Sequence, residues 1–325
     1  MAAYNWPWGI RGSGVFSVCI LACLLTISHG MSSSCGTSKN GGQYRTIPCL
    51  DAHVEMRFRT TPTAEYLSRG GNKAPLGRFP YMVSLRPTSG GSHTCGGVLV
   101  HRRLVLTAAH CEKDIGRNPL VQIGALNTHD DDRKDGVQVM RAEKLVLHPR
   151  WNGEFQDGFD MALLVLPEAV GNVDPIILPD RRSMTKPHTR VFALGWGWNF
   201  QLGVSTGKWE RSSDSSLMGI KMTIVRGDRC PLRGHLRPHM LCAYDAIQCP
   251  CKGDSGGPLI VPDEQDGVIE SGQPDKDLLL GITSIGYGDC TLANCAALFT
   301  DVAKFRTWID DTIVETRVDV SMVCA

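Results

Sequence analysis

The sequence predicts an all-β fold that ends in a helix. From Phe79 onward, short runs of β-branched and aliphatic residues recur between turns, at residues 81–85, 98–100, 103–106, 121–123 and 145–147. Repeated strands at this spacing are typical of a barrel or a sandwich. The stretch 302–313 differs, because its apolar residues recur at helical spacing. Asp301 stands where it could cap that helix.

The strand pattern falls into two halves within one domain. Residues 172–180, with two prolines, are expected to connect them, and strands resume at 190–194, 220–225, 258–261 and 278–282. All-β barrels commonly reach about 200–250 residues as one unit. We therefore expect a single domain over residues 68–317 and a tail over residues 318–325.

The first 30 residues are typical of a secretory signal peptide. Arg11 supplies a weakly positive start, residues 15–27 are uncharged and mostly apolar, and residues 28–30 form an imperfect cleavage site. A membrane anchor is the alternative, but the apolar run is shorter than the roughly 20 residues that a span needs. Residues 31–67 are rich in Ser, Gly, Thr and Arg and are interpreted as a pro-segment or linker.

Cysteine content also favours a secreted, extracellular protein. Of thirteen cysteines, Cys19 and Cys23 would leave with the signal peptide, so eleven remain. This density fits an oxidising compartment. The odd number leaves one thiol free or bridged to another molecule.

The charge pattern excludes several functions. The net charge is +1 with no basic run, which argues against nucleic-acid binding. No phosphate-cradling loop, dinucleotide fingerprint or zinc-type cluster is present, so no cofactor or metal is expected. Residues 262–277 carry six acidic side chains and are expected to form a solvated surface. The four aspartates within 129–135 favour a solvated turn over a calcium site.

Three motifs carry candidate chemistry. Ser255 lies within Gly-Asp-Ser-Gly-Gly, where glycines allow a sharp bend that could direct backbone N–H groups toward the hydroxyl. Taken alone, such a motif is more often a glycine-rich turn. His110 follows an apolar run and precedes Cys111, and Asp160 heads the apolar stretch 161–166. Together the three favour nucleophilic catalysis.

With these motifs, the sequence resembles the chymotrypsin/trypsin-like serine proteases over about residues 70–316. Further matches lie at residues 70–71, 77–81, 95–97, 195–197 and 284–286. The resemblance implies two six-stranded antiparallel β-barrels of the chymotrypsin type with a C-terminal helix. It also implies a monomer that hydrolyses peptide bonds in protein or peptide substrates without a cofactor, and that protein inhibitors could bind.

The resemblance assigns roles to the motif residues. Ser255 would be the nucleophile, His110 the general base and Asp160 the residue that orients the imidazole. The backbone N–H groups of Gly253 and Ser255 would form the oxyanion hole. Ser284 matches the position that hydrogen-bonds the triad aspartate. The implied disulfides are Cys95–Cys111, Cys230–Cys242 and Cys251–Cys290.

The primary specificity pocket departs from the trypsin pattern. Counting back from Ser255, Cys249 stands near the pocket base, where trypsin-like relatives carry an aspartate. Gly286 would leave one wall open, Ala297 would narrow the floor, and a Cys249–Cys295 bridge could close the base. We expect a neutral pocket for a small or medium apolar side chain. If the alignment slips by a residue or two, Asp245 or Asp289 would restore acidity.

Activation also departs from the family pattern. Relatives are zymogens whose new amino terminus pairs with the aspartate before the nucleophile, here Asp254. Ser68 and Arg69 stand where two β-branched aliphatic residues are usual. This departure keeps a non-catalytic homologue, acting as a binding or regulatory module, as the alternative function. A serine esterase of the α/β-hydrolase type is excluded by the order His, Asp, Ser along the chain.

Overall fold

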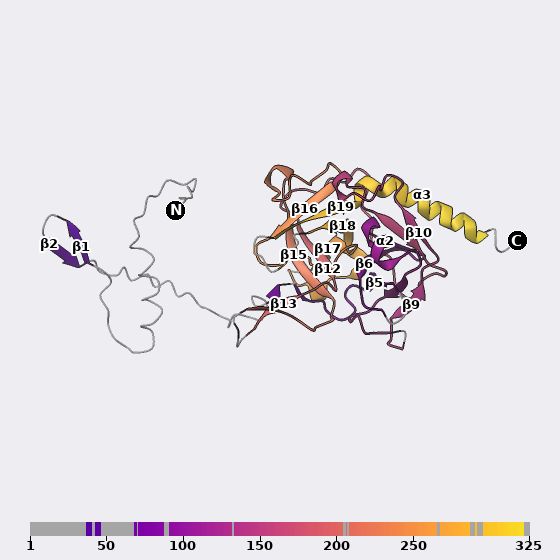
Figure 1. The fold of residues 1–325 in the computed structure, drawn as a ribbon, viewed down its shortest axis with the longest axis horizontal. Coiled ribbons are helices and arrows are strands. Elements are labelled where there is room, and N and C mark those ends of the chain that lie inside the picture. The colour runs from indigo at the N-terminus through magenta and orange to yellow at the C-terminus, as the bar shows by residue number, and fades with distance from the viewer. Residues whose placement is uncertain are drawn as a thin grey trace. The chain divides into compact units, whose positions relative to one another are not determined.

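A computed structural model describes two separate units of the chain. The described residues are 37–40, 43–46, 68–69, 71–87, 91–131, 133–203, 206, 208–264, 267–286, 290 and 295–321. The first unit, Met1–Thr61, contains the antiparallel pair β1 (Thr37–Asn40) and β2 (Gln43–Thr46). The second unit, Pro62–Ala325, contains all other elements (Figure 1). The expected signal peptide, Cys35, Cys49, Asp289 and Cys324 lie outside the described residues.

The first half of the second unit is a curled antiparallel sheet of seven strands. Their order is β10-β11-β7-β6-β5-β8-β9. The strands are β5 (Met82–Arg86), β6 (Cys95–His101), β7 (Leu104–Thr107), β8 (Leu120–Ile123), β9 (Gln138–Arg141), β10 (Lys144–Leu147) and β11 (Ala162–Val165). Strands β7 and β11 are buried along their whole length, as their continuous aliphatic sequences predict.

The second half closes into a six-stranded barrel because β12 pairs with both β15 and β17. Its strands are β12 (Arg190–Gly195), β15 (Met218–Ile224), β16 (Met240–Asp245), β17 (Pro258–Val261), β18 (Leu278–Ile285) and β19 (Cys295–Asp301), with β4 (Asn72–Lys73) added to β15. A small separate sheet joins β14 (Trp209–Arg211), β13 (Phe200–Leu202) and β3 (Ser68–Arg69). The first two residues of the expected domain, Ser68 and Arg69, are therefore paired, as β3, with a loop hairpin.

Helices are few and mostly short. The short ones are η2 (Ala109–Cys111), α2 (Glu112–Ile115), η3 (Phe155–Asp157), η4 (Gly227–Arg229), η5 (Ile269–Ser271) and η6 (Pro274–Lys276). The predicted C-terminal helix is α3 (Val302–Ser321), whose Val302, Phe305 and Ile309 are buried in the main core. No helix in the described part of the chain has the length and apolar character needed to cross a bilayer. The all-β prediction with a C-terminal helix is confirmed, with one half closed and the other curled.

One acidic residue of the 262–277 stretch is not solvated as expected. Asp277 is completely buried and accepts hydrogen bonds from Arg78 Nη1 at 2.5 Å and from Nη2 at 2.8 Å. The Tyr81 hydroxyl and the Asp263 backbone N–H also donate to this carboxylate. The expectation was wrong for Asp277 because a buried arginine far away in the sequence compensates its charge, which composition does not reveal.

Candidate active site

His110 follows the end of the buried strand β7, and the carboxylate of Asp160 holds its side chain in place. β7 ends at Thr107, η2 follows, and the Cys95–Cys111 disulfide ties η2 to the start of β6. His110 Nδ1 lies 2.7 Å from Asp160 Oδ2, and the His110 backbone N–H donates to Oδ1 at 2.9 Å. Because a carboxylate only accepts, Nδ1 carries the proton and Nε2 is left as the basic nitrogen.

Asp160 is itself fixed from the second half of the domain. Its side chain has no exposed surface, and the Ser284 hydroxyl donates to Oδ2 at 2.6 Å. Thr300 Oγ1 donates to the Asp160 carbonyl at 3.0 Å. Ser284 lies on β18 and Thr300 on β19, so strands of the barrel complete a site whose histidine belongs to the curled sheet.

The loop that carries Ser255 is packed against β6. The Gly96 backbone N–H donates to the Ser255 carbonyl at 2.7 Å. Gly256 has φ +78°, and a Cβ there would lie 2.2 Å from Thr107 Oγ1 and 2.5 Å from the Gly96 carbonyl oxygen. Only glycine fits this close approach, which explains why it follows the serine.

Ser255 and His110 line the same cleft, which has a volume of about 990 Å³. Within the described contacts the Ser255 hydroxyl is not hydrogen-bonded to His110. Such bonds are often long without substrate and shorten in the reactive complex.

Two backbone N–H groups in the serine loop are left without an acceptor. The neighbouring amides of Asp254, Gly256 and Gly257 donate to the carbonyls of Cys251, Thr283 and Asp254 at 3.0, 2.9 and 3.0 Å. By contrast, the N–H groups of Gly253 and Ser255 donate to no acceptor in the described part of the chain. These two residues flank Asp254, so their amides could serve an anion placed before the loop.

His93, whose importance was missed in the sequence, fixes the Gly253 peptide. Its Nε2 lies 2.9 Å from the Gly253 carbonyl oxygen, and its Nδ1 lies 2.8 Å from Ser84 Oγ. Burial lowers the pKa of His93 to about 4, so the ring is neutral. Because the carbonyl only accepts, Nε2–H donates to Gly253 and Nδ1 accepts from Ser84. The only sequence signal is the position of His93 two residues before Cys95.

Asp254 is a buried carboxylate without a cation among the described residues. It accepts from the backbone N–H groups of Cys251 at 2.7 Å and Gly197 at 2.8 Å. A Cβ at Gly195 or Gly197 would lie within 2.4 Å of its oxygens. Burial raises the pKa of Asp254 from its ordinary 3.8 to about 6, and the two hydrogen bonds oppose that effect.

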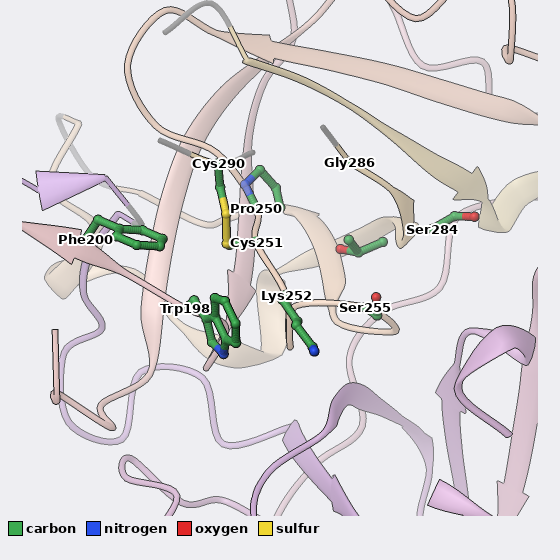
Figure 2. A pocket seen from close by; sticks show the side chains of 10 residues that line it. Trp198, Phe200, Pro250, Cys251, Lys252, Ser255, Ser284, Gly286 and Cys290 are labelled. Carbon is green, nitrogen blue, oxygen red and sulfur yellow. A yellow bond between two sulfur atoms is a disulfide. The ribbon is translucent and has the colours of Figure 1, made fainter. Parts of the chain in front are cut away.

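A second cavity of about 360 Å³ is also lined by Ser255 and shares Trp198 and Lys252 with the larger cleft. Figure 2 shows Trp198 and Phe200 near the Cys251–Cys290 disulfide, with Ser255 and Ser284 across the pocket. The lining residues are Trp198, Phe200, Pro250, Cys251, Lys252, Ser255, Thr283, Ser284, Gly286 and Cys290. None of them carries a carboxylate.

Of the predicted pocket residues, two line the cavity and two are buried outside its lining. Ser284 and Gly286 line the cavity, whereas Cys249 and Ala297 are buried outside its lining. Cys249 is bridged to Cys295, and Phe200 packs against the cluster that these two form with Cys290. The aromatic wall was not predicted, because Trp198 and Phe200 lie outside the motifs and the strand runs of the sequence.

Four disulfides join the described cysteines. Besides Cys249–Cys295, they are Cys95–Cys111, Cys230–Cys242 and Cys251–Cys290, the three pairs that the resemblance implies. Cys95, His110 and Cys111 form the one cluster of potential metal ligands in the described part of the chain. Its cysteines are oxidised to a disulfide and offer no thiolate, so the cluster does not suit a metal.

Known proteins are similar in sequence to this chain over most of its length. The sequence profile of the family named Trypsin matches residues 68–309. Granzyme M from Rattus norvegicus is 35% identical over 75% of this chain and 88% of its own length. Chymotrypsin-like elastase family member 1 from Canis lupus familiaris is 28% identical over 75% of this chain and 91% of its own length. Transmembrane protease serine 5 from Homo sapiens is 31% identical over 83% of this chain and 55% of its own length.

Proposed function

Because this chain belongs to the trypsin family and is a chymotrypsin-like serine endopeptidase, we propose that Ser255, His110 and Asp160 carry its reaction. The Ser255 oxygen attacks the scissile carbonyl carbon while its proton passes to His110 Nε2. The C–N bond then breaks, the leaving amine takes that proton, and an ester to Ser255 remains. Water, deprotonated by His110, hydrolyses the ester and regenerates the serine.

The pair of unoccupied amides is the observation that carries this proposal. The N–H groups of Gly253 and Ser255 are free to bind the oxyanion, while His93 holds the Gly253 carbonyl on the opposite side of its peptide. One such donor typically contributes about 3–4 kcal/mol to transition-state stabilisation.

The cavity beside Ser255 supports a preference for neutral side chains on the acyl side of the cleaved bond. Apart from Pro250 and Gly286, its lining is aromatic, sulfur-containing or hydroxylic, and Lys252 is its one charged residue. An arginine or lysine of the substrate would find no carboxylate there. We therefore propose that a small or medium apolar side chain occupies this pocket.

We also propose that the protein is secreted as a precursor. Four disulfides in the catalytic domain support an oxidising compartment. The buried Asp254 carboxylate, which has no cation among the described residues, is a place where an ammonium group freed by cleavage could pair. Ser68 and Arg69 are paired with β13.

A fluorophosphonate that reacts with activated serines tests the catalytic proposal. We expect the intact mass of the secreted, processed protein to rise by one label, and no rise in the Ser255→Ala variant. The same spectrum reports the mature amino terminus. Processed protein that takes no label would contradict the triad assignment and favour a binding module instead.

A further inference from the structure

The two cavities beside Ser255 belong to the two sides of the scissile bond. His110 returns its proton to the leaving amine, so that amine must lie on the side of Ser255 where His110 stands. The 990 Å³ cleft is lined by both residues, whereas the 360 Å³ pocket is lined by Ser255 without His110. The larger cleft therefore receives the leaving-group half of the substrate.

Two cationic side chains lie over the ring of an exposed tryptophan in this cleft. Trp198 is 37% exposed, the Arg211 guanidinium carbon lies 4.1 Å from its ring centroid, and Lys252 Nζ lies 5.3 Å from it. At these distances both cations interact with the aromatic face. In the view of Figure 2, the Lys252 side chain extends between Trp198 and Ser255. All three side chains border the cleft, and Trp198 and Lys252 stand where it adjoins the smaller pocket, which they also line.

Neither cation is neutralised by a carboxylate of the described chain. The ion pairs of that part of the molecule include neither Arg211 nor Lys252, and both residues are exposed. A guanidinium or ammonium that lies over a ring keeps its N–H donors available at its edge. The two side chains can therefore both attract and hydrogen-bond a substrate carboxylate.

The acidic residues of the cleft do not offset this positive charge. Asp214 Oδ2 forms an ion pair with Lys73 Nζ at 2.7 Å. Hydrogen bonds from Lys73 and Ser216 lower the pKa of Asp214 to about 2. Asp114 lies on α2, which follows His110 in the curled half, whereas Trp198 and Arg211 belong to the second half. His93 is neutral. The region around Trp198 is therefore the positive part of the cleft.

We propose that Trp198, Arg211 and Lys252 bind an aspartate or glutamate of the substrate on the leaving-group side of the cleaved bond. This inference rests on the proposed catalytic function and deepens it, because it names a substrate class. Trp198 would pack on the methylene groups of the acidic residue, and the two cations would contact its carboxylate. Each exposed charge pair of this kind typically changes affinity by about 1.4- to 5-fold.

Peptides that differ by one isosteric replacement test the proposal. Glutamate and glutamine are compared at each of the first three positions after the cleaved bond, with processed enzyme and kcat/KM as the readout. We expect the wild type to prefer glutamate by about 3- to 10-fold at one of these positions. The preference should fall toward one when the salt concentration rises to 1 M, because exposed charges are screened.

Charge-removing variants locate the preference. Lys252→Gln and Arg211→Gln should each lower the glutamate-to-glutamine ratio, and the double variant should bring it close to one. Lys186→Gln removes the same charge at an exposed position away from both cavities and should leave the ratio unchanged. A ratio measured within one variant does not depend on the fraction of enzyme that is folded.

The outcomes separate the two levels of the proposal. Absence of fluorophosphonate labelling of Ser255 would overturn the catalytic function and this inference with it. Labelled enzyme with a ratio of one at all three positions would overturn the acidic preference alone. A wild-type preference that persists in the double variant would also overturn it, because other groups would then bind the carboxylate.

Discussion

Asp254 makes the stability of the folded protein depend on pH in a defined direction. Its pKa is about 6 when folded and 3.8 ordinarily, so the folded state binds the proton more tightly than the unfolded chain. The resulting stability is fully present below pH 3.8 and is lost as the pH rises through about 6. A pKa change of this size corresponds to about 3 kcal/mol in total, of which about 2–3 kcal/mol falls between pH 4 and 7.5.

Urea unfolding of two matched proteins measures the pH-dependent contribution of Asp254 to the free energy of unfolding. Both carry Ser255→Ala to prevent self-cleavage, and one also carries Asp254→Asn, which cannot titrate. Asparagine loses one of the two amide contacts at every pH, so only the change in the difference with pH is informative. We expect the aspartate form to lose about 2–3 kcal/mol relative to the asparagine form from pH 4 to 7.5. A difference that stays constant with pH would refute the buried, unpaired carboxylate.

Three further perturbations test the framework around the site. Asp160→Asn should lower kcat by about 10⁴-fold, because its amide can stabilise the wrong tautomer of the histidine; a fall of less than tenfold would argue against the triad role. Arg78→Met should lower the free energy of unfolding by about 3–5 kcal/mol, measured in urea, since Asp277 would remain buried without its cation. A cost below about 1 kcal/mol would show that Asp277 is compensated in another way. Gly256→Ala should cost about 2–4 kcal/mol and abolish labelling of the nucleophile, because its Cβ would meet Thr107; wild-type labelling would contradict the close packing.

Much of the fold could be predicted because its strands are continuous aliphatic runs. β7 and β11 read as buried strands, and the helical spacing of Val302, Phe305 and Ile309 gave the position of α3. Pairing of distant charges could not be predicted in this way. The buried partner of Asp277 lies 199 residues away in the sequence, so nothing local indicates it.

The reactive motifs are local, whereas the walls of the cavities are assembled from distant loops. The residues around Ser255 indicated a nucleophile because tight backbone packing there requires glycine at particular positions. Trp198 and Phe200 belong to no motif or strand run of the sequence, and the contact of Phe200 with the cysteine cluster depends on how the chain after β12 folds back. Only the folded chain shows that they border the pocket.

The contact between β6 and the serine loop makes the catalytic geometry a property of both halves of the domain. His110 and Asp160 are supplied by the curled sheet, Ser255 and Ser284 by the barrel, and the Gly96–Ser255 backbone hydrogen bond joins the two. A small shift of one half against the other would separate base and nucleophile while leaving every strand intact. Partial denaturation is therefore expected to abolish peptide hydrolysis at denaturant concentrations where circular dichroism still reports a folded β-protein.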